Sequence, residues 1–374
     1  MVRRAHKKSR NGCLECKRRH VKCDEQRPIC SNCTAAERIC EYSTRIVNIN
    51  PKPPLTASTP IASPSPSAGS PSVAFDDLPV NMLHVELFHN LFTATYTTFD
   101  PNGSLTWLPE VVSHTIKTPY LVNEMLAFSA LHLSTTRPAQ RDYYHYHAAQ
   151  LQTQALAIFK ETSPEVTQET CIPLFFFSSV LGIHMLCDTL IYRENDFDHF
   201  LTRFVHYLRL HHGVRAIISQ AWSMLLDSIL KPAFNSGIEL YQSHGPLAPG
   251  CEKLQNLIIA ANLGTELTET YQRAIKSLQA CINIANAEHV DHVAANAVIT
   301  WPILVKLEFS DLLEQRRPEA LVILAHYAVL LHRYRDSWLF GDSGRFIIEE
   351  VTRYLGSEFE EWLEWPLEAL QSPN

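Results

Sequence analysis

The fold of the N-terminal end is decided by residues 13–40, CLECKRRHVKCDEQRPICSNCTAAERIC. This stretch holds six of the ten cysteines of the 374-residue chain, arranged as a CxxC-x6-C unit that occurs twice. They are Cys13, Cys16, Cys23, Cys30, Cys33 and Cys40. A CxxC pair with a third cysteine six residues later is suited to a tetrahedral zinc site. Because each unit supplies three thiolates, two four-coordinate zinc ions require that one thiolate of each unit bridges both metals.

The segment around these cysteines cannot build a hydrophobic core. Residues 1–45 contain few large apolar side chains, chiefly Leu14, Val21, Ile29 and Ile39. We therefore expect zinc to supply most of its folding free energy, about 10–16 kcal/mol for each structural site in small zinc peptides. A cluster whose ligands are all thiolates is closed, and a catalytic zinc needs an open position for water.

Two other interpretations of the cysteines are weaker. A disulfide framework is typical of secreted chains, whereas the first residues, MVRRAHKKSR, are basic and no apolar signal segment follows them. A RING-type or LIM-type module uses eight ligands that usually include histidine, and only His6 and His20 are near. A binuclear thiolate cluster is favoured over both.

Charge divides the chain into a basic head and an acidic body. Residues 1–42 contain eleven Lys or Arg and five Asp or Glu, a net +6, so residues 43–374 carry −13 of the overall −7. The most basic run is Lys17-Arg18-Arg19-His20-Val21-Lys22, directly after the first CxxC. This run has the length of a short helix, whose N-terminal end could enter the major groove of DNA. A short basic head on a long acidic body predicts a module that binds a polyanion, attached to a domain with another task.

The whole pattern of residues 13–40 resembles the binuclear zinc cluster of fungal transcription factors, including the basic run after the second cysteine and Pro28 in the central loop. The resemblance implies two short helices around two Zn²⁺, with Cys13 and Cys30 as the bridging thiolates. One zinc would bind Cys13, Cys16, Cys23 and Cys30, and the other Cys13, Cys30, Cys33 and Cys40. It further implies that Arg19 and His20 reach base edges, while Lys17, Arg18 and Lys22 bind phosphates. We add Lys7, Lys8 and Arg10 as candidate DNA-binding residues.

Two further regions follow the head. Residues 46–80 contain eight prolines among Ser and Thr, which predicts a disordered linker between the cluster domain (1–45) and the body (81–374). In the body, apolar residues recur at helical spacing, for example Leu83, Leu87 and Leu91. No series of short alternating strands appears, so we expect a large all-α regulatory domain.

The apolar stretch from Leu174 to Leu186 is too hydrophobic for one face of a surface helix. It predicts a core helix, with an oligomer interface or the wall of a ligand pocket as the alternatives. The longest apolar run of the chain, Ile172 to Cys187, is interrupted by Pro173, Ser178, Ser179, Gly182 and His184, so we expect no membrane span. Cys171, Cys187, Cys251 and Cys281 lack the spacing of metal ligands, which predicts that they are buried apolar residues.

The C-terminal part of the body resembles fungal regulators related to the sterol uptake control protein. The similarity lies in Trp301-Pro302, the run from Leu324 to His332, Trp338, and the segment from Trp362 to Pro366. The resemblance implies a helical domain, which senses a sterol in the best-known members of that group.

Together these features predict a nuclear, sequence-specific DNA-binding regulator of genes transcribed by RNA polymerase II in a fungus. We expect it to activate genes of a sterol-related or secondary-metabolite pathway. The expected partners are double-stranded DNA, a second copy through the helical domain, a sterol or other small apolar ligand, and transcription coactivators. The alternative is a zinc-dependent protein-interaction module without a DNA target. No Ser/His/Asp order, Gly-rich phosphate loop or HExxH segment predicts an enzyme.

Overall fold

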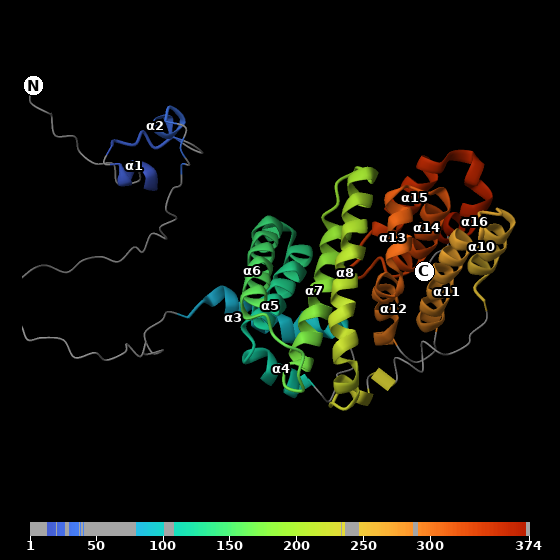
Figure 1. The fold of residues 1–374 in the computed structure, drawn as a ribbon, viewed down its shortest axis with the longest axis horizontal. Coiled ribbons are helices and arrows are strands. Elements are labelled where there is room, and N and C mark those ends of the chain that lie inside the picture. Colours follow the sequence, from blue (N-terminus) through green and yellow to red (C-terminus); the bar gives the residue numbers. More distant parts are fainter. Residues whose placement is uncertain are drawn as a thin grey trace, which may run out of the picture. The chain divides into compact units, whose positions relative to one another are not determined.

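The computed structural model describes residues 13–19, 21–26, 30–36, 38, 40, 80–100, 108–232, 234–235, 247–286 and 291–371. Contacts within the chain divide it into two compact units, residues 1–75 and residues 76–374 (Figure 1). We call the described part of the first unit the head and that of the second unit the body. Apart from Val80, the predicted linker lies outside the described residues.

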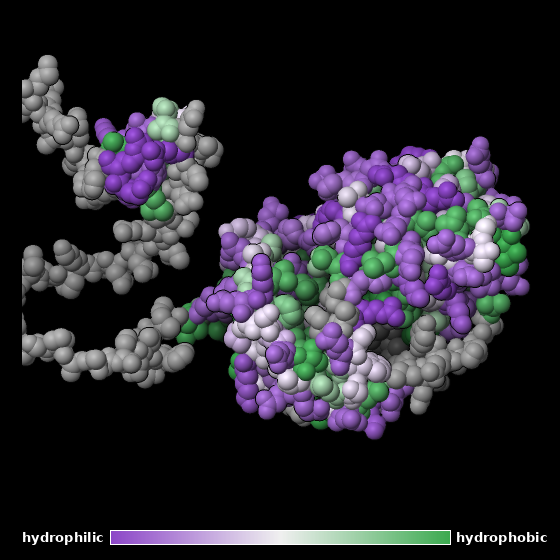
Figure 2. Space-filling view, in the orientation of Figure 1, coloured by the Kyte–Doolittle hydropathy of each residue, from purple (hydrophilic) through white to green (hydrophobic). Residues whose placement is uncertain are grey.

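The described head consists of two short helices and the segments that follow them. Helix α1 spans Leu14–Arg18 and helix α2 spans Ser31–Thr34. Each helix begins directly after the first cysteine of a CxxC pair, so the second cysteine of the pair lies within the helix. Figure 2 shows that the described surface of the head is mostly hydrophilic, as expected of a unit without an apolar core.

The described body consists of helices and turns, with no strand among its described residues. Its first half contains α3 (Met82–Asn90), the π-helical turn η2 (Leu91–Thr95), the 3-10 turn η3 (Tyr96–Thr98), α4 (Leu108–Ile116), α5 (Pro119–Thr136), η4 (Pro138–Gln140), α6 (Arg141–Thr162), α7 (Cys171–Ile191) and α8 (Phe197–Leu226). Its second half contains α10 (Pro249–Ala260), α11 (Thr265–Asn286), α12 (Asp291–Leu304), α13 (Leu307–Glu314), α14 (Pro318–Arg333), α15 (Ser343–Leu355), η5 (Gly356–Phe359) and α16 (Glu360–Gln371). The predicted fold class, a small two-helix cluster domain with a large all-α domain, is confirmed.

Local sequence signals account for several helix ends. Asp196 accepts a hydrogen bond from the backbone N–H of His199 at 3.0 Å, which caps the N-terminus of α8. Pro119 and Pro318 occupy the first turns of α5 and α14, where proline costs no hydrogen bond. Helix α6 ends at Thr162, and its C-terminal cap, Ser163, adopts the left-handed conformation (φ 41°) directly before Pro164.

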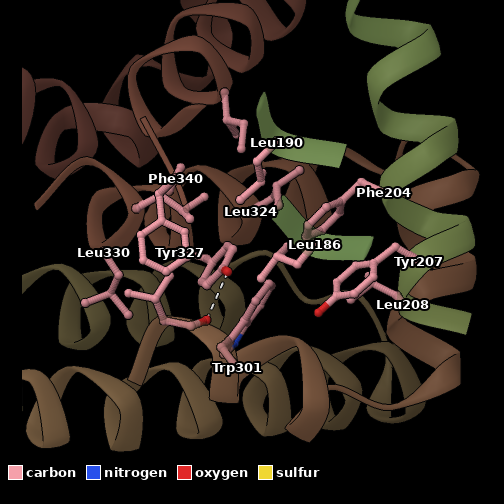
Figure 3. Packing of buried hydrophobic residues seen from close by; sticks show 14 of the residues in the cluster. Leu186, Leu190, Phe204, Tyr207, Leu208, Trp301, Leu324, Tyr327, Leu330 and Phe340 are labelled. Carbon is pink, nitrogen blue, oxygen red and sulfur yellow. Dashed lines mark hydrogen bonds between the residues drawn. The ribbon is translucent and has the colours of Figure 1, made fainter. Parts of the chain in front are cut away.

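The centre of the body lies where α7, α8, α12 and α14 meet (Figure 3). Trp301 of α12 is fully buried and stacks on Tyr327 of α14, with ring centroids 4.3 Å apart. The polar ends of both rings are satisfied. The Trp301 indole N–H donates to the Ala274 carbonyl at 3.2 Å, and the Tyr327 hydroxyl donates to the Val298 carbonyl at 3.0 Å.

Helix α7 is the apolar stretch singled out in the sequence. By length and composition it is the one helix among the described residues that could cross a membrane. Its Leu174, Phe177, Leu186 and Leu190 are buried, however, and it packs between α5 and α8. A Cβ atom at Gly182 would lie 2.4 Å from the His211 ring of α8, so glycine allows the two helices this close approach. The structure therefore supports a core helix, the first of the three interpretations.

Candidate metal centre and nucleic-acid interface

The cysteines of each CxxC pair are positioned by a helix N-terminus. Cys13 precedes α1, and its Sγ accepts a hydrogen bond from the backbone N–H of Cys16 at 3.3 Å. Cys30 precedes α2 in the same way, with extended backbone dihedrals, and Cys33 follows inside the helix. A thiolate at this position takes the place of the side-chain oxygen that usually caps a helix. The backbone enters both helices in the same extended conformation, but the thiol caps the helix at Cys13 and makes no such cap hydrogen bond at Cys30.

The six sulfur atoms gather into two groups of four. Cys13, Cys16, Cys23 and Cys30 form one group, and Cys13, Cys30, Cys33 and Cys40 form the other, with all sulfurs of a group within 4.8 Å of one another. The Sγ atoms of Cys13 and Cys30 lie 3.7 Å apart, and those of Cys16 and Cys30 lie 3.6 Å apart. A tetrahedral zinc with Zn–S bonds of about 2.3 Å places its sulfurs about 3.8 Å apart.

The donor set therefore fits two zinc ions with two shared thiolates. The shared residues, Cys13 and Cys30, are those that the family resemblance implies as bridges. Five of the six cysteines are buried, and Cys40 is partly exposed. All six are free thiols, which argues against the disulfide framework.

Electrostatics inside the cluster favour a cation. Burial, with hydrogen bonds to the neighbouring thiols, raises the pKa of the Cys16 thiol to about 12. Burial also acts to raise the pKa of Cys30, but hydrogen bonds from the Cys33 backbone and neighbouring thiols bring it below its ordinary value. Six thiolates this close repel one another, so they need positive charge between them. Two Zn²⁺ supply +4 and leave a net −2, which the surrounding Lys and Arg partly offset.

The basic run lies partly in α1 and partly after it. Helix α1 begins at Leu14 and ends at Arg18, so it starts three residues earlier than the sequence suggested. Arg19 forms its C-terminal cap, and residues 21–26 are not helical. The side chains of Lys17, Arg18, Arg19 and Lys22 are exposed. His20, Lys7, Lys8 and Arg10 lie outside the described residues.

Two polar contacts that sequence reasoning missed join the halves of the repeat. The Asp24 carboxylate accepts hydrogen bonds from the Ser31 backbone N–H at 3.1 and 3.2 Å, at the start of α2. The Asn32 side-chain amide donates to the Lys22 carbonyl at 2.7 Å. No periodicity marks these residues, because they act across the loop between the repeats and their partners are backbone groups. They hold the loop after the basic run against α2.

The body has no comparable cluster of metal-binding residues among those described. Cys171, Cys187, Cys251 and Cys281 are buried in the apolar interior, as predicted. A shallow hollow between α10 and α16 is lined by Glu252, Lys253, Asn256 and Glu361 together with apolar residues. Its polar lining does not resemble a sterol site, so it offers no support for the expected sterol.

Comparisons with known proteins agree with the geometry of the head. Residues 11–48 match the family model described as fungal Zn(2)-Cys(6) binuclear cluster domain. The chain is 25% identical to a Zn(2)-C6 fungal-type transcription factor of Gibberella zeae, over 98% of this chain and 86% of that protein. It is 27% identical to the Zn(2)-C6 fungal-type transcription factor afumD of Aspergillus fumigatus, over 87% of this chain and 86% of that protein.

A third relative is similar over a short length. Sterol uptake control protein 2 of Candida albicans is 62% identical over 40 residues, which is 11% of this chain and 6% of that protein. A match of 40 residues is far too short to include the helical body. The resemblance of the body to the sterol uptake control group thus stays a prediction.

The head is a binuclear zinc cluster domain, and its cofactors are two zinc ions. The chain thus carries a fungal Zn(2)-Cys(6) binuclear cluster domain, as its sequence indicated, and over most of its length it is similar to named fungal Zn(2)-C6 transcription factors.

Proposed function

We propose that this protein is a nuclear transcription regulator that binds a specific sequence of duplex DNA through its head. The proposal rests on one observation: the head combines a closed ligand set for two zinc ions with exposed cations on and directly after α1. A rigid cluster holds these cations in one fixed arrangement. A protein that recognises a specific DNA sequence needs such a fixed arrangement of its contact residues. The closed ligand set also argues against catalysis at the metal.

The contacts follow from the chemistry of each side chain. Lys17, Arg19 and Lys22 are exposed and carry charge that duplex phosphates attract. Arginine also donates in a fork to guanine O6 and N7, so Arg19 is our candidate for base reading, together with His20. Lys7, Lys8 and Arg10 are proposed to add phosphate contacts ahead of the cluster.

We assign the body a regulatory task. Its surface holds exposed apolar side chains, among them Met82, Val85 and Phe88 on α3. A second copy of the chain or a coactivator could bind there and cover them. Sterol-related or secondary-metabolite genes remain the proposed targets. The name of the Candida albicans relative favours the first group, and the acidic character of the body favours activation.

The deciding experiment selects binding sites from random duplexes with the full-length protein loaded with zinc. We expect one enriched motif, two zinc ions per chain, and retention on DNA that weakens steeply as salt rises. Loaded protein that enriches no motif, and that is not retained at low salt, would leave the zinc-dependent interaction module as the better interpretation.

A second experiment examines the ligand of the body. Melting temperatures of the full-length protein are compared with and without saturating ergosterol, because a ligand that binds only the folded state raises the melting temperature. A rise supports the sterol. An unchanged value favours dimerisation or coactivator docking as the task of the body.

A further inference from the structure

The carboxylate of Glu15 binds two arginines on the surface of the head. Arg18, one helical turn later, donates to it through Nε and Nη2, both at 2.9 Å. Arg38, from the second half of the repeat, donates through Nη1 at 3.3 Å. The Glu15 side chain is 16% exposed, whereas those of Arg18 and Arg38 are 68% and 51% exposed. The carboxylate thus lies under the two guanidinium groups.

The two-pronged contact with Arg18 is the geometry in which arginine and a carboxylate interact best. The contact with Arg38 connects the first CxxC helix to the segment between Cys33 and Cys40. These three residues, which we call the Glu15 clamp, therefore fasten the two halves of the cluster domain on one side.

We propose that Glu15 is a positioning residue for DNA recognition, which holds Arg18 within the head and so leaves phosphate and base contacts to Lys17, Arg19 and Lys22. The proposal rests on the proposed function. It differs from the family resemblance, which implies that Arg18 binds a phosphate.

Charge explains why DNA does not simply draw Arg18 away. Release of Arg18 would leave Glu15 with one longer hydrogen bond from Arg38, close to a cluster with a net charge of −2 and to the approaching phosphates. A carboxylate that keeps only this weaker partner repels the duplex. Among the described residues, Lys17, Arg19 and Lys22 form no ion pair within the head, so only their charges are fully available.

The experiment compares Arg18→Ala with Arg19→Ala in the zinc-loaded full-length protein. The affinity for the selected duplex and for an unrelated duplex of equal length is measured over a range of salt concentrations. We expect Arg18→Ala to weaken binding to both duplexes alike by a few-fold, since Glu15 then keeps Arg38 alone, and to leave unchanged the slope of log affinity against log salt concentration (the salt slope). Arg19→Ala should instead lower the salt slope by about one, because it removes a contact with the DNA. Zinc content of two ions per chain, measured for each variant, confirms an intact head.

Glu15→Gln provides the opposite change. It frees both arginines, so we expect the salt slope to become steeper by about one to two. The affinity for unrelated DNA should rise several-fold, and the ratio of specific to unrelated affinity should therefore fall. Adding Arg18→Ala to Glu15→Gln should reverse about half of that increase. A residue that merely stabilised the fold would not steepen the slope.

Equal losses of slope in Arg18→Ala and Arg19→Ala would overturn the proposal. If Glu15→Gln lost its zinc, the comparison of the two arginine variants would decide alone. The proposed function fails in a different way, because the unaltered protein would then not be retained on DNA at low salt.

Discussion

The sulfur atoms of Cys13 and Cys30 lie 3.7 Å apart, although 17 positions separate the two residues in the chain. Both belong to each of the two four-sulfur groups, while every other cysteine of the head belongs to one group only. The first cysteine of each CxxC-x6-C unit, Cys13 or Cys30, is therefore the ligand that links the two metal sites. Loss of a shared sulfur affects both metal positions, and loss of an outer sulfur affects one.

This arrangement predicts unequal effects of two conservative substitutions. Cys30→Ser removes a ligand from both zinc sites, so we expect most of the zinc and the folded head to be lost. Cys40→Ser removes a ligand from one site, and about one zinc per chain should remain, since each structural site contributes on the order of 10 kcal/mol. Metal analysis after gel filtration measures both values. Equal zinc contents in the two variants would contradict the sharing of Cys30.

Two substitutions in the basic run should affect DNA binding differently, because one removes a base contact and the other a phosphate contact. We expect Arg19→Ala to relax the sequence preference, at a cost of about 1–3 kcal/mol for a lost base contact. Lys22→Ala should weaken binding to all sequences and lower the salt slope by about one. Site selection and salt titration with the full-length variants measure the two effects. Identical behaviour of both variants on every duplex would argue against base reading by Arg19.

Burial in the body predicts how much each leucine matters. Leu186 of α7 is 1% exposed, whereas Leu156 of α6 is 42% exposed. We expect Leu186→Ala to lower the free energy of unfolding by about 2–5 kcal/mol and Leu156→Ala by less than about 1 kcal/mol. Urea unfolding, followed by circular dichroism, provides the comparison. Two equally small losses would mean that α7 is not a core helix.

Sequence reasoning reached the metal centre more fully than its surroundings. The number of cysteines alone predicts shared thiolates, since six are too few for two separate tetrahedral zinc sites. The basic run predicts a helix that starts at Lys17, whereas α1 starts at Leu14 because the Cys13 thiol caps a helix that begins inside the CxxC pair.

Sequence patterns do not predict the contacts between the two halves of the cluster domain. Glu15 and Arg38 are 23 residues apart, and Asp24 binds a backbone N–H whose position only the folded chain defines. In the body, the apolar stretch left three interpretations open, and packing against α5 and α8 distinguished them. Helical spacing predicts which residues are buried, but not which helices they meet.

Buried histidines predict an acid-sensitive body. Burial lowers the pKa of His132, His211 and His326 to about 4 in each case, compared with an ordinary value of 6.5. The unfolded chain therefore takes up protons below about pH 6.5 that the folded chain does not, and stability falls until about pH 4. Each histidine contributes a slope of up to about 1.4 kcal/mol per pH unit in that window.

His132 offers the test of this pH dependence, because its Nδ1 lies 2.8 Å from the Thr95 hydroxyl and its ring stacks on Trp338. Asparagine can keep the hydrogen bond to Thr95 but cannot titrate, so His132→Asn should lose less stability than the unaltered protein between pH 7 and pH 5. The free energy of unfolding at both pH values gives the difference, in which the contributions of carboxylates cancel. Equal losses in the two proteins would show that His132 accepts its proton as readily when folded as when unfolded.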